Sequence, residues 1–405
     1  MEPKPTPIRR VAAFLGLQKS MIALLSMVIL VGLGEKMAER FLPLYLVALG
    51  GGVLSVGLLN GLDNLLSALY SFPGGYASDK LGYKRALLLF NLIAMAGYLI
   101  VIIFPSWQAA IIGAVLFVSW TAISLPATMD LVSTVLPKNK RTMGVSMHSL
   151  VRRIPMALGP IIGGVLIGVY GEIRGVRLAL MTAFVLAGVA LVFQQTMIDE
   201  RPRPTHGEGA LRAYGLSLIN RPLRNLLTSD ILVRFCEQIP YAFVVIWCVS
   251  ENGVTPLQFG FLTAIEMVTA MLVYIPVAFL ADRSTKKPFV VITFIFFTLF
   301  PLVLLISKSF PMMVIAFIIR GLKEFGEPTR KALIMDLAPE DRKAATFGLY
   351  YLIRDIIVSL AAFGGAFLWM ISPATNFLAA FGFGCLGTII FAFFGRDLGP
   401  ETIVK

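Results

Sequence analysis

Charged side chains inside long apolar segments are the residues of this chain that could do chemistry. Acids and bases occur together at 35–40, 230–237 and 320–327, within segments otherwise built of aliphatic and aromatic residues. A charge in hydrocarbon is costly unless it faces water or a partner, so these residues are candidates for a substrate cavity or a coupling relay. The candidate set is Glu35, Lys36, Glu39, Arg40, Asp230, Arg234, Glu237, Arg320, Lys323, Glu324 and Glu327, with Trp120 from a segment that has no charge at mid-depth.

The spacing places the charges of each segment on one side of a helix. The four charges at 35–40 fall within about 140° of arc at about 100° per residue. Arg320 with Glu324 and Lys323 with Glu327 have the i,i+4 spacing of helical ion pairs. Such pairs could merely neutralise each other in a wet cavity. We expect that they form a polar substrate site or a coupling relay.

Six further charged residues are candidates for gates. Asp63 and Glu266 occupy equivalent places in two segments and are interpreted as paired gating acids. Arg354 lies toward the side that carries the basic loops, and Asp355 is expected to be its local partner. The gating candidates are Asp63, Asp130, Arg152, Glu266, Arg354 and Asp355.

The elements that position these side chains are membrane-spanning helices. Of 405 residues 57% are hydrophobic and only 14% are charged, and the mean hydropathy is +0.83. Soluble domains have about a quarter of their residues charged, and a spanning helix needs about 20 apolar residues. An all-α membrane protein with twelve spans is predicted. The spans are expected near 21–48, 53–77, 85–105, 107–136, 143–170, 175–198, 223–250, 256–281, 288–307, 310–336, 344–371 and 374–395.

The basic residues are distributed unevenly over the loops. With both termini on one side, 24 of the 35 Lys and Arg fall in the loops and tails of that side, and only Arg174, Arg177 and Lys308 fall opposite. Cytoplasmic loops carry such an excess, which predicts a cytoplasmic (inner) membrane protein with both termini in the cytoplasm. The net charge of +12 is thereby explained, and nucleic acid is not expected as a partner.

The composition argues against enzymes and cofactors. Cys236, Cys248 and Cys385 lie in apolar runs without metal-type spacing, and the chain has two histidines. No Gly-x-x-x-x-Gly-Lys-(Ser/Thr) loop is present, so ATP is not expected as the energy source. We predict no metal, no cofactor and no catalytic set of nucleophile and base.

The chain repeats itself after 202 or 203 residues. The longest cytoplasmic connection, 199–222, separates the expected six-helix bundles 1–198 and 223–405. When the two halves of the sequence are aligned at this offset, acidic residues align with acidic residues and an intramembrane arginine aligns with an arginine. Two unrelated apolar sequences would not align their charged residues in this way by chance. The matched pairs include Gly57 with Gly260, Asp63 with Glu266, Asp79 with Asp282, Arg152 with Arg354 and Gly163 with Gly365. Two parallel six-helix repeats are typical of one class of transporters.

A charged turn follows the second span. It reads Gly75-Tyr-Ala-Ser-Asp79-Lys80-Leu-Gly82-Tyr-Lys84-Arg85. This resembles the signature of the major facilitator superfamily, of bacterial or archaeal type, at every defining position. The resemblance implies a latch that holds the two halves together in one state. The second copy keeps Asp282 and Arg283 but has Ala278 and Thr285 in place of the glycines, so we expect a weaker latch there.

Span five carries Gly159-Pro160-x-x-Gly163-Gly164. This resembles the core of a motif of proton-coupled drug or metabolite antiporters in the same superfamily. Proline and glycine also permit a bend or close helix packing, and that interpretation explains the segment equally well.

The resemblance covers the whole chain and implies a secondary active transporter that works by alternating access. In the family, spans one, four, seven and ten line the cavity. We predict proton-coupled efflux of drugs or metabolites by a monomer whose partners are a small solute, the proton and the bilayer. The first alternative is uptake or exchange of a small charged or zwitterionic metabolite. The second alternative is lipid or lysolipid flipping. The alternative from another functional class is a membrane sensor that does not transport.

Overall fold

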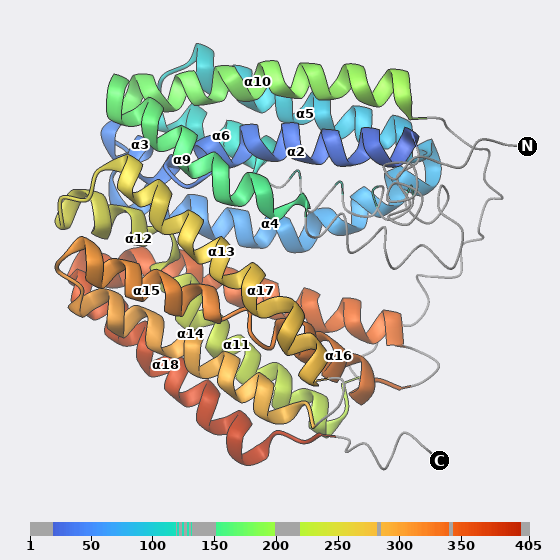
Figure 1. The fold of residues 1–405 in the computed structure, drawn as a ribbon, viewed down its shortest axis with the longest axis vertical. Helices are drawn as coiled ribbons and strands as arrows, with labels where there is room; N and C mark the ends of the chain where they lie inside the picture. Colours follow the sequence, from blue (N-terminus) through green and yellow to red (C-terminus); the bar gives the residue numbers. More distant parts are fainter. Residues whose placement is uncertain are drawn as a thin grey trace, which may run out of the picture. The chain divides into compact units, whose positions relative to one another are not determined.

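The computed structural model describes residues 19–118, 120, 124, 128, 131, 151–198, 219–281, 285–339 and 343–397. Over this part of the chain the regular structure is helical and no strand occurs (Figure 1). The predicted all-α fold class is confirmed. Two compact units are present. One comprises Met1–Tyr45 and Leu69–His206, and the other Leu46–Ala68 and Gly207–Lys405.

The first unit contains the N-terminal helices. Its helices are α2 (Lys19–Glu39), α3 (Leu42–Ala48), α4 (Gly52–Leu81), α5 (Tyr83–Ile103), α6 (Trp107–Phe117), α9 (Arg153–Tyr170) and α10 (Glu172–Met197). The end of α3 and the first part of α4, up to Ala68, group with the second unit. The expected bundle boundaries at 198 and 223 stay a prediction.

The second unit contains the remaining helices. They are α11 (Arg221–Tyr241), α12 (Phe243–Ile246), the π-helical turn η4 (Trp247–Glu251), α13 (Pro256–Ala281), α14 (Lys287–Ile306), α15 (Phe310–Leu322), α16 (Glu327–Leu337), α17 (Lys343–Ile371) and α18 (Pro373–Phe394). The axis bends by 43° between α11 and the segment Phe243–Glu251. Pro240 lies next to this bend. Proline bends a helix because it cannot donate the backbone hydrogen bond of its position.

Equivalent pairs of helices pack together in the two units. In the first, α2 packs against α9 and α10, α5 against α6 and α10, and α9 against α10. In the second, α11 packs against α17 and α18, α14 against α15 and α18, and α17 against α18. These pairs correspond under the sequence offset of about 200 residues, so the repeat seen in the sequence is a repeat of packing.

One contact shows the correspondence at the level of single residues. A Cβ on Gly163 would lie 2.0 Å from the carbonyl oxygen of Met37, and a Cβ on Gly365 would lie 2.2 Å from that of Ile239. Both the glycines and their neighbours are 202 residues apart. Glycine is required at both positions because two helices approach there with their backbones in contact.

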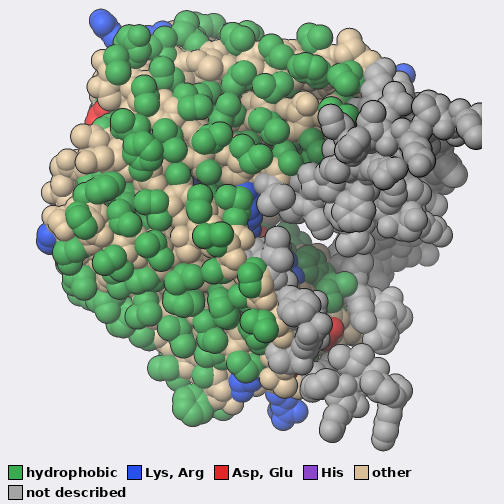
Figure 2. Space-filling model, viewed as in Figure 1, with side chains coloured by type: hydrophobic (Ala, Val, Ile, Leu, Met, Phe, Trp, Pro, Cys, Tyr) green, Lys and Arg blue, Asp and Glu red, His purple; other side chains and the backbone are tan. Residues whose placement is uncertain are grey.

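The outer surface is apolar. Hydrophobic side chains cover most of the face visible in Figure 2, and exposed residues include Val185, Leu272, Leu360 and Phe393. Among the described residues nine helices are long and apolar enough to span a membrane, or ten if α11 and the bent segment after it count as one span. Helix α6 is apolar but shorter. The expected number of twelve spans stays a prediction.

Candidate functional site

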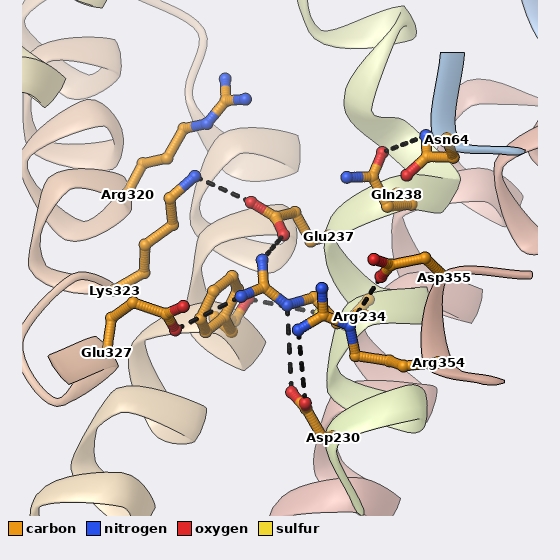
Figure 3. Close-up of polar contacts among 12 residues, drawn as sticks. Asn64, Asp230, Arg234, Glu237, Gln238, Arg320, Lys323, Glu327, Arg354 and Asp355 are labelled. Atoms are coloured by element: carbon orange, nitrogen blue, oxygen red, sulfur yellow. Dashed lines mark hydrogen bonds and ion pairs between the residues drawn. The ribbon is translucent and has the colours of Figure 1, made fainter. Parts of the chain in front are cut away.

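The second unit holds a network of buried charges. It connects α11, α13, α15, α16 and α17, and Figure 3 shows most of its members. Helices α11, α13 and α17 and the shorter helices α15 and α16 carry these groups among aliphatic and aromatic side chains. Buried charges persist in such surroundings only when they are paired.

Glu237 on α11 is held by two cations. Its Oε2 lies 2.6 Å from Nη1 of Arg234, one turn earlier on the same helix, and its Oε1 lies 2.8 Å from Nζ of Lys323. Lys323 caps the C-terminus of α15, so this pair joins two helices that the sequence separates by 86 positions. Arg234 and Lys323 both lie over the ring of Phe297, at 5.0 and 5.8 Å from its centre.

Glu266 on α13 accepts the next two contacts. Its Oε1 lies 3.2 Å from Nε of Arg320 and 3.2 Å from Nζ of Lys323. Glu266 is 1% exposed and Arg320 3% exposed. Lys323 therefore lies between two carboxylates, while Arg320 faces one.

Asp230 on α11 is the centre of the other end of the network. Arg330 of α16 forms an ion pair with Oδ2, Tyr350 of α17 donates a hydrogen bond to the same oxygen at 3.0 Å, and Arg354 lies 3.5 Å from it. Arg354 also donates to Asp355 at 2.7 Å, the neighbour with which the sequence pairs it. One carboxylate thus holds three helices together.

Glu327 links the two ends. Its carboxylate accepts hydrogen bonds from Arg330 at 2.7 and 3.1 Å and from Arg234 at 3.3 Å. The ion pairs consequently run without a gap from Arg320 to Asp355. Neighbouring ion pairs share a charged residue. A solute or a proton that breaks one ion pair therefore changes which partners are available to the neighbouring pair.

The two i,i+4 pairs that the spacing indicates within 320–327 do not form. Arg320 meets Glu266 in place of Glu324, and Lys323 meets Glu237 and Glu266 in place of Glu327. The reason is that α15 ends at Leu322 and α16 begins at Glu327, with turns between them. Helical spacing does not hold across this break.

Arg330 is a site residue that the sequence reasoning missed, because it was counted among the basic residues of a cytoplasmic loop. It belongs to α16 and is buried, at 1% exposure. The i,i+3 spacing from Glu327 was the signal that could have revealed it. Gln238 was missed as well, since a neutral side chain carries no charge signal. It accepts a hydrogen bond from Asn64 at 3.2 Å (Figure 3).

The first unit contains a smaller acidic cluster on α2. Lys36 lies 3.1 Å from Glu35 and forms an ion pair with Glu39. Glu35 is buried, while Arg40 is half-buried. Glu35 and Glu237 are 202 residues apart, so equivalent positions of the two repeats carry glutamates, of which Glu35 is buried and Glu237 half-buried.

Trp120 is buried in the same unit. Its indole nitrogen finds no hydrogen-bond partner among the residues that the structure describes.

The glycine and proline motif of α9 packs on this acidic cluster. A Cβ on Gly159 would lie 2.7 Å from Cβ of Lys36, and Gly163 touches the backbone of Met37. Pro160 and Gly164 are buried in the same helix. The motif therefore brings α9 close to the charged turn of α2.

The signature turn is described in part. Gly82 precedes α5 with φ 81° and ψ 154°, a conformation that side chains rarely adopt. Lys84 donates to the carbonyl oxygen of Gln195 at 2.9 Å, which ties the start of α5 to the end of α10. Lys80 is exposed in the last turn of α4 and Arg85 is exposed in the first turn of α5.

Other predicted site residues are placed less fully. In the second copy of the turn, Lys286 forms an ion pair with Asp336. Asp63 and Arg152 are half-buried. Asp130, Asp282 and Arg283 lie outside the described residues, as do the side chain of Asp79 and the surroundings of Gly75. Within the described residues no group of His, Cys, Asp or Glu could hold a metal ion.

Comparison with known proteins agrees with the fold and the repeat. The model of the Major Facilitator Superfamily matches residues 24–238 and again residues 226–404. An uncharacterized MFS-type transporter of Methanocaldococcus jannaschii is 21% identical over 356 residues, which is 85% of this chain and 87% of that protein.

Solved structures share the architecture at low sequence identity. The nucleoside transporter NupG is 14% identical with a TM-score of 0.75, covering 93% of this chain and 100% of that one. The peptide transporter POT in complex with sulfate is 14% identical with a TM-score of 0.76, covering 96% and 97%. A bacterial homologue of the human lysosomal transporter Spinster is 13% identical with a TM-score of 0.75, covering 97% and 98%. Because the family model matches nearly the whole length of this chain, the chain belongs to the major facilitator superfamily of membrane transporters.

Proposed function

We propose that the chain is a secondary active transporter that moves a small charged or zwitterionic solute by alternating access and couples this movement to a proton gradient. The observation that carries the proposal is the buried network of ion pairs on α11, α13, α15, α16 and α17. We place the protein in the cytoplasmic membrane with both termini in the cytoplasm.

The network favours a charged solute over an apolar one. Guanidinium and ammonium groups that already face carboxylates can exchange them for the carboxylate or phosphate of a solute at little cost, because charge stays paired throughout. An apolar drug offers no such replacement. The solved structures of similar fold include a nucleoside transporter and a peptide transporter, and a free peptide is a zwitterionic solute.

Proton coupling follows from the same arrangement. A buried carboxylate that loses its cation is expensive to keep charged, so it takes up a proton instead. The free energy of protonating this carboxylate then differs between the two access states. A proton gradient can therefore drive the movement of the solute without a cofactor.

The proposal is tested with purified protein in two steps. A thermal-unfolding screen at pH 6 and pH 8 would use L-glutamate, succinate, glycerol 3-phosphate and dialanine as charged solutes, with uridine and tetraphenylphosphonium for comparison. A bound solute stabilises the folded state by mass action. The best binder is then offered, radiolabelled, to proteoliposomes with an imposed pH gradient, with protein-free vesicles as the control.

Saturable accumulation that collapses with an uncoupler is the expected result. If no charged solute stabilises the protein or accumulates, the proposal is wrong.

Proton-coupled efflux of drugs or metabolites is the second candidate. It is favoured by the contact of Gly159 with Lys36, which joins the antiporter-like motif to the acidic cluster of α2. Accumulation of tetraphenylphosphonium in exchange for protons, without any response to the charged solutes, would favour it.

A further inference from the structure

We propose that Arg354 and Arg234 bind the phosphoryl group of the transported solute in place of the carboxylate of Asp230. This inference rests on the proposed function and names the class of solute, which is a phosphate monoester or inorganic phosphate itself. Asp230 is then an internal anion that faces the two arginines until the solute arrives.

Two N–H groups of this site are buried and have no hydrogen-bond partner among the residues that the structure describes. They are Nη1 of Arg354 and Nε of Arg234. Arg354 as a whole is only 8% exposed. Leaving a buried donor unpaired costs free energy, and the cost is larger when the donor is charged. An acceptor that reaches both groups removes this cost.

Both N–H groups face the carboxylate of Asp230, which does not satisfy them. Nη1 of Arg354 lies 3.5 Å from Oδ2, Nε of Arg234 lies 3.9 Å from Oδ1, and Figure 3 shows the carboxylate pointing toward both arginines. Arg330 and the hydroxyl of Tyr350 already contact Oδ2. A carboxylate oxygen has two lone pairs, so a third donor to the same oxygen is left over.

A phosphoryl group fits these donors better than a carboxylate does. Asp230 shows the limit of a carboxylate here, because two donors stay unbonded although both face it. A phosphate monoester carries three terminal oxygens in a tetrahedral arrangement. It can therefore accept from Arg354 of α17 and Arg234 of α11 at the same time. Guanidinium N–H groups match phosphate oxygens in pairs, which makes arginine suited to this ligand.

Other contacts fix the two guanidinium groups without using these donors. The guanidinium carbon of Arg354 lies 4.2 Å from the ring centre of Tyr351, and its Nε donates to Asp355 at 2.7 Å. Arg234 is held through Nη1 and Nη2 by the two glutamates described above. Both donors are thus held in place before the solute binds, which lowers the entropy lost on binding.

The first repeat folds without most of these charges. At the offset of 202 residues, Asp230 corresponds to Val28. Arg234 corresponds to Gly32, and only Arg354 matches another arginine. Helix α2 nevertheless packs against α9 and α10 as α11 packs against α17 and α18. The fold therefore does not require Asp230 and Arg234, and charges of this kind within spans usually serve a function.

The charges at this end of the network cancel before the solute binds. Three arginines face three acids, namely Arg234, Arg330 and Arg354 with Asp230, Glu327 and Asp355. A phosphoryl group adds negative charge, and protons taken up from water on the open side balance it. This agrees with the proton coupling of the proposed function.

Thermal unfolding of the purified protein tests the class of solute. Inorganic phosphate, glycerol 3-phosphate and succinate are compared at pH 7.5, with KCl keeping the ionic strength equal. Both phosphates should stabilise the protein at concentrations at least about tenfold lower than succinate. If succinate or L-glutamate binds and accumulates in proteoliposomes while neither phosphate does, this inference is wrong and the proposed function stands.

A lipid headgroup is the other source of a phosphoryl group, so lysophosphatidate forms a fourth arm of the comparison. Stabilisation by glycerol 3-phosphate that equals or exceeds that by lysophosphatidate supports a soluble solute. A response to lysophosphatidate alone would overturn the assignment to a soluble solute.

Variants test the roles of the two arginines and of Asp230. Arg354→Lys should weaken phosphate binding by about tenfold to a hundredfold, since a point charge lacks the fork. Asp230→Asn should strengthen phosphate binding by about tenfold, because the internal anion loses its charge, and a merely structural role of Asp230 predicts no such gain. Arg396→Gln removes an exposed arginine after α18 and is the matched control, with unchanged binding expected.

The measured quantity is the shift that the ligand causes in each variant, so a change in the stability of the free protein does not enter. Asp230→Asn should fold, because Glu327 still accepts two hydrogen bonds from Arg330. Unchanged phosphate affinity in Arg354→Lys, or weaker phosphate binding in folded Asp230→Asn, overturns the inference. An equal loss in Arg396→Gln would show that phosphate binds to surface charge and would overturn it as well.

Discussion

Replacing Gly365 with alanine would place a methyl group against the backbone of α11. The new Cβ would lie 2.2 Å from the carbonyl oxygen of Ile239, whereas ordinary contact begins at 3.4 Å. The two helices have to separate by about 1 Å, and overpacking of this kind costs about 1–3 kcal/mol. A Cβ on Gly364, the preceding residue, would have no atom within 4 Å.

The two glycines provide a matched comparison on one helix. Alanine favours the helix over glycine by up to about 1 kcal/mol at both positions, so this gain cancels in the difference between them. We expect Gly364→Ala to be neutral or slightly stabilising. Gly365→Ala should lower the unfolding temperature by roughly 2–10 °C relative to it.

Thermal unfolding of both purified variants in one detergent, followed by tryptophan fluorescence, measures this difference. The equivalent pair in the first unit is Gly163→Ala, with Gly168→Ala as its open-space control. Equal unfolding temperatures within either pair would refute the claim that the repeated helices are locked by backbone contact at these glycines.

Three further predictions concern charges and turns. Arg330→Met should destabilise by about 1.5–3 kcal/mol, because Asp230 loses its ion pair with Arg330 while Arg354 and Tyr350 still face it, and adding Asp230→Asn should recover part of the loss of unfolding temperature. Gly82→Ala should cost about 1–3 kcal/mol, since φ 81° with ψ 154° is a glycine conformation, and an unchanged unfolding temperature would contradict this. Asp79→Asn should reduce solute flux in vesicles more than Asp282→Asn, because the second copy of the turn lacks both glycines, and equal defects would show that the two copies contribute alike.

The fold could be predicted because its signals are local or repeated. Apolar length indicates the spans, and the turn from Gly75 to Arg85 indicates the family without any knowledge of packing. The match of Gly163 with Gly365 is visible in the sequence, and the structure explains it by equivalent contacts with residues 37 and 239.

The partners of the buried charges could not be predicted in the same way. Spacing along one helix tells which charges share a face, but the ion pairs form between helices, and the helix at 320–327 is interrupted. Glu266 was interpreted as a gating acid paired with Asp63, whereas the structure shows it beside Arg320 and Lys323. Arg330 was taken for a loop residue because basic residues usually mark the cytoplasmic end of a span.

The interruption between α15 and α16 creates two helix ends inside the site, and each end has its own partial charge. The C-terminus of a helix is negative and the N-terminus positive, by about half an elementary charge. Arg320 and Lys323 stand at the end of α15, and Glu327 opens α16. Each formal charge is therefore stabilised by the peptide dipoles of its own helix, by about 0.3–1 kcal/mol even when its ion-pair partner leaves. A continuous helix through 310–337 would carry the same side chains without this support, so the break lowers the cost of holding these charges while their counter-ions are exchanged.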